Sequence, residues 1–224
     1  MSIDPFITRF EDLPEILPVF PLSQVILLPG GRLPLNVFEP RYLALTCDAL
    51  AEGRLFGLIQ PSGSGETVGE APPPLYTVGS VGRIIHFAET DTRQFFIVVA
   101  GLCRFQVKGE AEGKDGYRRL SVDYAPFRED LTTPGGGTVS APRERITHAL
   151  QRFVEAHALD IDLRALDALS TPSLVATLSM ALPFETPEKQ ALLEAPTLEH
   201  RFNALCALME MGAVGGPFSG DATQ

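Results

Sequence analysis

Short apolar runs separated by proline and glycine fill the first half of the chain. The runs are rich in β-branched and aromatic residues, which favours strands. The expected strands cover residues 17–20, 25–28, 33–38, 55–60, 80–88, 93–108 and 117–127. Gly101 interrupts the longest of them, so we expect a bulge or a sharp bend there. Many short strands at these spacings predict a barrel or a sandwich.

One helix is expected within this half of the chain. Glu39 precedes Pro40, and a residue before proline avoids the α conformation, whereas proline suits the first helical position. We therefore expect the helix to begin at Pro40 and to end near Gly53.

The second half of the chain is predicted to be helical. Beyond a glycine-rich stretch the apolar period changes from two to about 3.6 residues, and a helix should start at Pro142. Its apolar stripe is Ile146, Ala149, Leu150, Phe153, Val154 and His157. Asp162, Thr171-Pro172, Thr186-Pro187 and Thr197 mark the starts of further helices.

These patterns predict an α+β protein with two lobes. The β lobe should cover residues 14–131 and the helical lobe residues 142–212, with a linker at 132–141 between them. The ends, 1–13 and 213–224, have few apolar anchors and are expected to be flexible tails.

The charge balance argues against two classes of partner. The 28 acidic and 18 basic residues give a net charge of −10, so neither nucleic acid nor an anionic membrane surface is an expected partner. The longest apolar run, 95–103, is far shorter than the roughly 20 residues of a membrane span. Cys47, Cys103 and Cys206 lie far apart among apolar residues, which predicts buried, reduced thiols in a cytoplasmic protein. The first 25 residues lack a basic segment followed by an apolar stretch, so no signal peptide is expected.

Motifs for catalysis are missing from the sequence. The segment 109–115 (GEAEGKD) has three residues between its glycines, whereas a P-loop needs four. We find neither the HExxH pattern of zinc enzymes nor a GxSxG elbow. We therefore expect no enzyme activity, no cofactor and no metal. A small hydrolase or cysteine-dependent enzyme, with Cys103 beside His86, and an RNA-binding protein remain as alternatives.

Six segments and Arg201 resemble the amino-terminal, substrate-binding domain of the Lon protease. The segments are 17–22 (LPVFPL), 27–30 (LLPG), 35–42 (LNVFEPRY), 78–84 (VGSVGRI), 101–105 (GLCRF) and 188–194 (EKQALLE). Full Lon proteases continue into ATPase and peptidase domains, so the chain resembles a stand-alone member that lacks both.

The resemblance implies a PUA-like pseudo β-barrel followed by a small helical bundle. It also implies a non-enzymatic protein-binding module that delivers or senses unfolded clients in protein quality control. The expected partners are unfolded or apolar peptide segments, and a protease or another protein. Cereblon, a ubiquitin-ligase adaptor, carries a similar domain.

The Lon-like segments contain the candidate site residues. Phe38, Arg41, Tyr42 and Arg83 are the expected peptide-binding residues, although a purely structural role is the competing interpretation. Glu39 and Arg104 stand among apolar neighbours, where a charge is costly unless it is paired. We therefore expect these two residues to form a structural ion pair.

Overall fold

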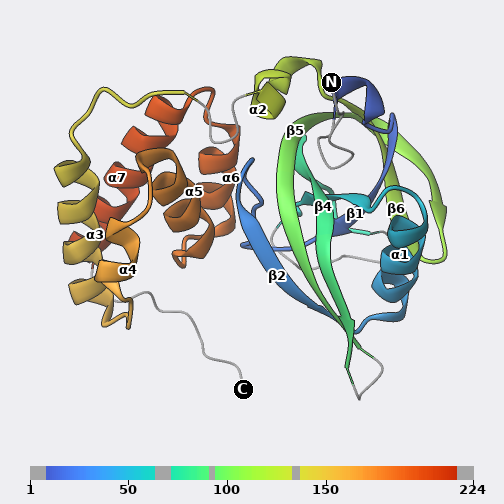
Figure 1. Cartoon of the computed structure of the whole chain (residues 1–224), viewed down its shortest axis with the longest axis horizontal. Coiled ribbons are helices and arrows are strands. Elements are labelled where there is room, and N and C mark those ends of the chain that lie inside the picture. The colour runs from blue at the N-terminus through green and yellow to red at the C-terminus, as the bar shows by residue number, and fades with distance from the viewer. Residues whose placement is uncertain (1–8, 64–71, 91–93, 133–136, 216–224) are drawn as a thin grey trace, which may run out of the picture.

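The structure, a computed structural model, describes residues 9–63, 72–90, 94–132 and 137–215. The strands lie in one half of the molecule and most of the helices in the other (Figure 1). Six strands and helix α1 form a β lobe, and helices α3 to α7 form a helical lobe beside it. The predicted α+β class is confirmed, while the exact limits of lobes, linker and tails stay predictions.

The six strands form one mixed sheet that closes on itself. They are β1 (Ile16–Pro21), β2 (Arg32–Val37), β3 (Leu55–Ile59), β4 (Val78–Glu89), β5 (Phe95–Lys114) and β6 (Tyr117–Asp123). Their order is β2-β5-β4-β3-β1-β6, and β6 also pairs with the far end of β5. Strand β5 is long enough to pair with β2, β4 and β6, which closes the barrel. Among the described residues, β2 pairs with no strand other than β5.

Strand β3 is buried on both faces, as its continuous apolar sequence suggests. Phe56 and Leu58 face a core that includes Tyr42 and Leu45 of α1 (Pro40–Ala51). The other core, which contains Leu55 and Ile59, gathers side chains from β1, β4, β5 and β6. The predicted start of α1 at Pro40 is confirmed.

Two details of the β lobe test the sequence patterns. The predicted strand at 25–28 is wrong, because this segment runs as a loop between Pro21 and Pro29. Its side chains diverge: Leu27 enters the α1 core, whereas Ile26 and Leu28 pack with the helical lobe. The predicted irregularity at Gly101 is confirmed by a register shift between β4 and β5.

The helical lobe follows the predicted apolar stripe. Its helices are α3 (Arg143–His157), α4 (Leu163–Asp167), α5 (Thr171–Ala181), α6 (Thr186–Glu194) and α7 (Leu198–Gly215). Four residues of the α3 stripe are fully buried and two are half-buried. Asp162 caps α4 as predicted, but α5 and α6 each begin one residue earlier than expected, with Ser170 and Glu185 at their caps.

The 3-10 helices η1 (Phe10–Asp12) and η2 (Ala125–Phe127) and the one-turn helix α2 (Glu129–Thr132) pack near the top of the barrel (Figure 1). Residues 213–215 continue α7, whereas residues 1–8 and 216–224 lie outside the described residues.

Cys103 and Cys206 are buried as predicted, but Cys47 is exposed, because it lies on the outer side of α1.

Candidate functional site

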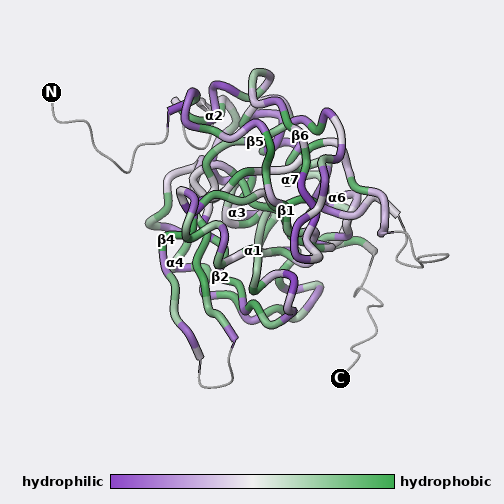
Figure 2. The backbone as a smooth tube through the Cα atoms, turned by 90° about the vertical axis from the view of Figure 1, so that its right-hand side faces the viewer, coloured by the Kyte–Doolittle hydropathy of each residue, from purple (hydrophilic) through white to green (hydrophobic). Residues whose placement is uncertain are grey.

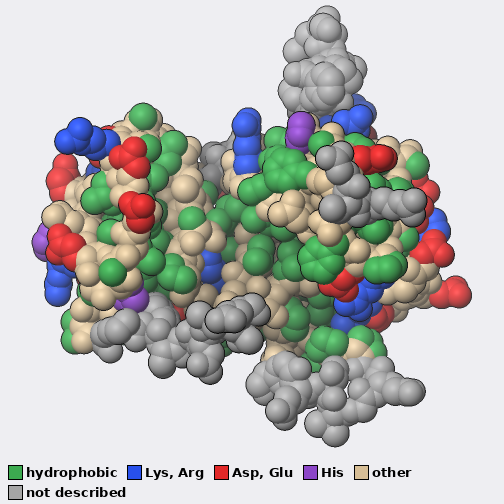
Figure 3. All heavy atoms as spheres, turned by 90° about the horizontal axis from the view of Figure 1, so that it is seen from below, with side chains coloured by type: hydrophobic (Ala, Val, Ile, Leu, Met, Phe, Trp, Pro, Cys, Tyr) green, Lys and Arg blue, Asp and Glu red, His purple; other side chains and the backbone are tan. Residues whose placement is uncertain are grey.

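Apolar side chains are exposed where the β4–β5 hairpin extends from the barrel. Figure 2 shows both strands of this hairpin as hydrophobic almost to its hydrophilic end. We use "hairpin surface" for Phe38, Ile85, Phe87, Phe95 and Phe96. Phe38 is 62% exposed, Ile85 44% and Phe87 36%, whereas Phe95 and Phe96 are half-buried. Figure 3 shows hydrophobic side chains gathered on this lower face of the barrel.

Strand register explains why both faces of the hairpin are apolar. Ile97 of β5 pairs with Leu35 of β2 and Phe87 of β4, which places these three side chains on one face. Phe96 pairs with Asn36 and Ala88, so its side chain lies on the opposite face. A sheet with one solvent face normally alternates apolar and polar residues. The missing alternation therefore leaves apolar area exposed.

Aromatic contacts hold the hairpin surface in place. Phe87 and Phe95 meet edge to face with ring centroids 5.0 Å apart, and His86 meets Phe96 in the same way at 5.9 Å. Such pairs contribute roughly 0.5–1.5 kcal/mol each. The rings are thus ordered before any partner arrives, which lowers the entropy cost of binding.

The structure separates the four residues predicted to bind peptide. Phe38 lies on the hairpin surface. Tyr42 is buried and stacks on Phe20 at 3.8 Å, so it is a core residue. Arg41 is exposed and lies over the Tyr42 ring, and Arg83 is half-buried in β4 opposite Leu55. Of these four, only Phe38 offers a large exposed apolar side chain.

Sequence patterns alone do not single out Ile85, Phe87, Phe95 and Phe96 as binding residues. The available signal was the largely apolar run 84–87 (IIHF) and the Phe95-Phe96 pair. Such a run is typical of a strand covered on both faces, and the sequence does not reveal that these faces stay open.

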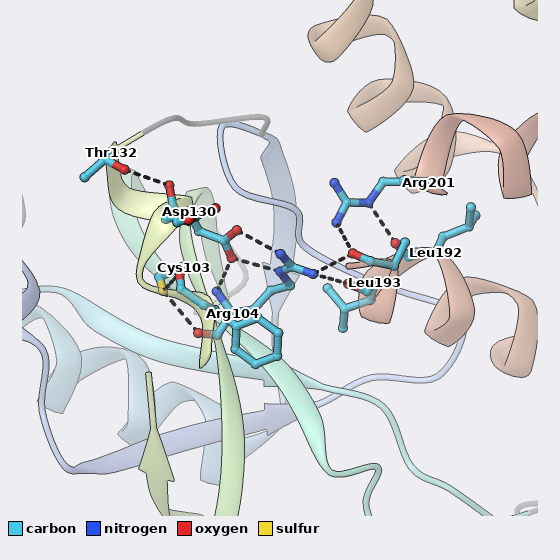
Figure 4. Close-up of polar contacts among 10 residues, drawn as sticks. Cys103, Arg104, Asp130, Thr132, Leu192, Leu193 and Arg201 are labelled. Carbon is cyan, nitrogen blue, oxygen red and sulfur yellow. Dashed lines mark hydrogen bonds and ion pairs between the residues drawn. The ribbon is translucent and has the colours of Figure 1, made fainter. Parts of the chain in front are cut away.

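The predicted Glu39–Arg104 ion pair is wrong in its partner. Arg104 is buried and forms a bidentate pair with Asp130 of α2, Nε to Oδ2 at 2.8 Å and NH2 to Oδ1 at 2.9 Å (Figure 4). Glu39 instead accepts from Arg41 at 2.7 Å on the surface. Glu39 and Arg104 do not pair because they lie in different places: Glu39 precedes α1 at the barrel surface, whereas Arg104 points toward the helical lobe.

Arg104 also joins the two lobes. Its NH1 donates to the backbone oxygens of Leu193, at 3.1 Å, and Ala195, at 2.8 Å, at the end of α6. Arg201 of α7 donates to Leu192 and Ala195 in the same place (Figure 4). The last carbonyls of a helix lack intrahelical partners and carry partial negative charge. Two arginines therefore cap α6, and one of them comes from the barrel.

A pocket of about 540 Å³ lies above this interlobe contact, with Arg104, Asp130 and Arg201 in its wall. Glu129, Glu194 and Glu199 also line it. The arginines already donate to protein carbonyls and to Asp130, so their hydrogen-bonding capacity is largely used inside the fold. The interlobe contact is therefore structural, and the hairpin surface is the stronger candidate for binding.

Lys189 of α6 is a buried cation near the same interface. Its Nζ donates to the backbone oxygens of Ser179, at 3.0 Å, and Met180, at 2.6 Å, at the end of α5. Burial lowers the pKa of Lys189 to about 8 from an ordinary 10.5. The folded protein therefore binds fewer protons than the unfolded chain between these two pH values.

We predict that the free energy of unfolding of the wild type increases with pH relative to that of Lys189→Met, because the pKa of Lys189 is depressed in the folded protein. Between pH 7.5 and 9.5 the gain should be roughly 1–2 kcal/mol, because the cost of burying the charge disappears as Lys189 loses its proton. Urea unfolding of both proteins across this range measures the difference. A constant difference would show that Lys189 titrates normally.

Cys103 does not resemble an activated nucleophile. Burial and the nearby Asp130 carboxylate raise the pKa of its thiol to about 12. Its Sγ donates to the backbone oxygens of Arg104 and Phe127. His86 pairs with Val98, whereas Cys103 pairs with Val81, so the two side chains of the considered Cys–His pair lie apart.

Among the described residues, no helix has both the length and the apolar character needed to cross a bilayer. This finding covers α7, the longest helix described, which runs from Leu198 to Gly215.

Sequence comparison places the chain among Lon relatives. The family model of the ATP-dependent protease La (LON) substrate-binding domain matches residues 16–211. Lon protease 2 of Myxococcus xanthus is 30% identical over 213 residues, which cover 92% of this chain and 24% of that protein. The Lon protease of Roseiflexus castenholzii is 32% identical, with 89% and 24% covered. The chain thus spans about a quarter of these relatives, and the predicted stand-alone character stays a prediction.

Solved structures show the same fold. The Lon N-terminal domain protein from Xanthomonas campestris superposes with a TM-score of 0.59 at 23% identity, covering 86% of this chain and 97% of that one. The N-terminal domain of the Mycobacterium avium complex Lon protease gives 0.58 at 17% identity, covering 87% and 97%. Because the family model matches nearly the whole described chain, the resemblance seen in the sequence is confirmed, and the chain belongs to the Lon substrate-binding domain family.

Proposed function

We propose that this protein binds apolar segments of unfolded polypeptides through its hairpin surface, and that it senses or delivers them to a protease or another partner. Membership of a substrate-binding family supports a recognition role. The observation that carries the proposal is the exposure of Phe38, Ile85 and Phe87 around one hairpin. A concentration of exposed apolar side chains on a folded protein marks an interaction surface.

The chemistry of this surface favours broad and weak recognition. Covering a partly exposed phenylalanine contributes about 1 kcal/mol, since full burial gives roughly 1.5–3 kcal/mol. A flexible client loses entropy when it becomes ordered, which offsets much of this gain. We therefore expect dissociation constants on the order of micromolar or weaker, with little dependence on salt.

We place this activity in the cytoplasm. The cysteines Cys47, Cys103 and Cys206 are free thiols in the structure, and free thiols persist in reducing compartments.

The test replaces hairpin phenylalanines with serine. We predict that Phe38→Ser with Phe87→Ser weakens binding of an unfolded apolar model polypeptide roughly 10- to 100-fold, because each ring provides about 1 kcal/mol or more. Titration of a fluorescently labelled, permanently unfolded client measures the affinity.

The helical lobe offers matched controls. Met211 is 62% exposed, like Phe38, and Leu163 is 37% exposed, close to Phe87 at 36%. Met211→Ser with Leu163→Ser removes similar apolar exposure elsewhere and should leave the affinity unchanged. An equal loss in both double variants, or none in either, would refute binding at the hairpin surface.

A further inference from the structure

Strand β2 has a free edge. Its register with β5 pairs Arg32 with Ala100 and Asn36 with Phe96. The Gly101 backbone N–H donates to the Gly31 oxygen at 2.9 Å, which fixes the alternation of the ladder. Leu33, Leu35 and Val37 therefore direct their backbone groups toward β5, whereas Arg32, Pro34 and Asn36 direct theirs outward.

Proline content supports this assignment. Pro34 has no N–H to donate, so in an unbroken ladder its backbone must face away from β5. The outward edge then offers N–H groups at Arg32 and Asn36, and carbonyl oxygens at Arg32, Pro34 and Asn36. Within the described part of the chain these five groups have no protein hydrogen-bond partner.

Side chains along β2 indicate what the edge accommodates. Leu33 and Leu35 are only half-buried, although they pack against the α1 core. An added strand would cover the exposed part of both, because its side chains would lie beside theirs on the same face. Phe38 follows β2 directly, so the free edge is continuous with the hairpin surface.

We propose that an extended apolar segment of a client polypeptide pairs with the free edge of β2 as an additional strand. This inference rests on the proposed function and states how the client is held. Main-chain hydrogen bonds provide an affinity that is independent of client sequence, while Leu33, Leu35 and Phe38 select apolar side chains. The missing N–H of Pro34 limits the number of bonds, which keeps binding reversible and discourages continuous sheet growth.

The surroundings of β2 favour a single strand over a second copy of this chain. The free edge is turned toward the helical lobe (Figure 1), and Figure 3 shows a hollow between the two lobes. Met180 of α5 closes its upper end, because a Cβ added to Gly31 would lie 2.5 Å from the Met180 sulfur. One extended segment needs less room in this hollow than the edge of another barrel.

Asn36 provides the sharpest test. Asn36→Pro removes an outward N–H and leaves the β2–β5 ladder unchanged, whereas Asn36→Ala keeps that N–H and serves as the matched control. We expect Asn36→Pro to weaken binding of an apolar model peptide roughly two- to tenfold, as the loss of one backbone hydrogen bond predicts, and Asn36→Ala to bind like wild type. In wild type, the same peptide should slow amide exchange at Arg32 and Asn36 severalfold.

The outcomes separate this inference from the proposed function. If the phenylalanine double variant loses binding but Asn36→Pro does not, and the Asn36 amide exchanges freely in the complex, the client binds by side chains alone and strand addition is wrong. If the Asn36 amide is already protected without peptide and Asn36→Pro dissociates a dimer, a second copy occupies the edge. The exchange measurement uses wild type, so it decides the matter even if Asn36→Pro fails to fold.

Discussion

Replacement of Arg104 by alanine should lower the free energy of unfolding by about 3–5 kcal/mol, the cost of breaking a buried ion pair from one side. The variant leaves the Asp130 carboxylate buried without its cation. It also removes the barrel's donors to Leu193 and Ala195 at the end of α6. Both losses fall on the contact between the lobes, so the lobes should separate more easily as well.

Thermal and urea unfolding measure the loss, which corresponds to a drop in melting temperature of roughly 10 °C for a chain of this size. The matched control is Arg41→Ala. Arg41 and Glu39 form an ion pair of similar length, 2.7 Å, but both side chains are about half exposed. Exposed pairs contribute about 1 kcal/mol or less. If the two variants lose the same stability, burial does not strengthen the Arg104–Asp130 pair.

A second variant distinguishes lost polarity from lost packing. Arg104→Met combined with Asp130→Leu removes both charges and retains much of the volume, so it should recover part of the stability. The carbonyls of Leu193 and Ala195 still lack the Arg104 donor, although Arg201 continues to donate to Ala195. Recovery should therefore be incomplete.

The sequence correctly predicts that Arg104 forms a buried ion pair, but it does not predict which carboxylate is the partner. A charged residue within an apolar strand must be paired when buried, and the structure shows such a pair. Glu39 is a carboxylate among apolar neighbours in the Lon-like segments, so the sequence favours it as the partner. Asp130 lies in α2, a single turn of helix that no periodic pattern marks. Pairing across 26 residues depends on how the chain returns over the barrel, which local sequence does not encode.

The same distinction applies to the candidate site. Apolar density predicts strands β4 and β5 well, because it is a property of the local chain. The exposure of Phe87 cannot be predicted from neighbouring residues, because it depends on whether other elements of the fold pack against the hairpin. Tyr42 shows the converse: the sequence predicts a peptide-binding residue next to Phe38, whereas the side chain stacks on Phe20 inside the core.

Gly101→Ala should also destabilise the fold strongly, by about 3 kcal/mol or more, the upper end of overpacking effects. A Cβ at Gly101 would collide with the Leu28 carbonyl oxygen and lie 2.9 Å from the Leu28 carbonyl carbon. Backbone cannot rotate away as a flexible side chain does. Gly101 also exchanges backbone hydrogen bonds with Gly30 and Gly31, so the collision would break the contact that fixes the loop before β2.

Gly109, in the same strand, is the matched control. A Cβ added there meets nothing within 4 Å, and alanine lowers the entropy of the unfolded chain. Gly109→Ala should therefore be neutral or slightly stabilising in the same urea titration. Equal stability of the two variants would mean that the loop before β2 moves aside to accommodate the added Cβ at little cost in free energy. In that case the start of β2 would not be fixed by Gly101, and the free edge would lack the rigid register that strand addition requires.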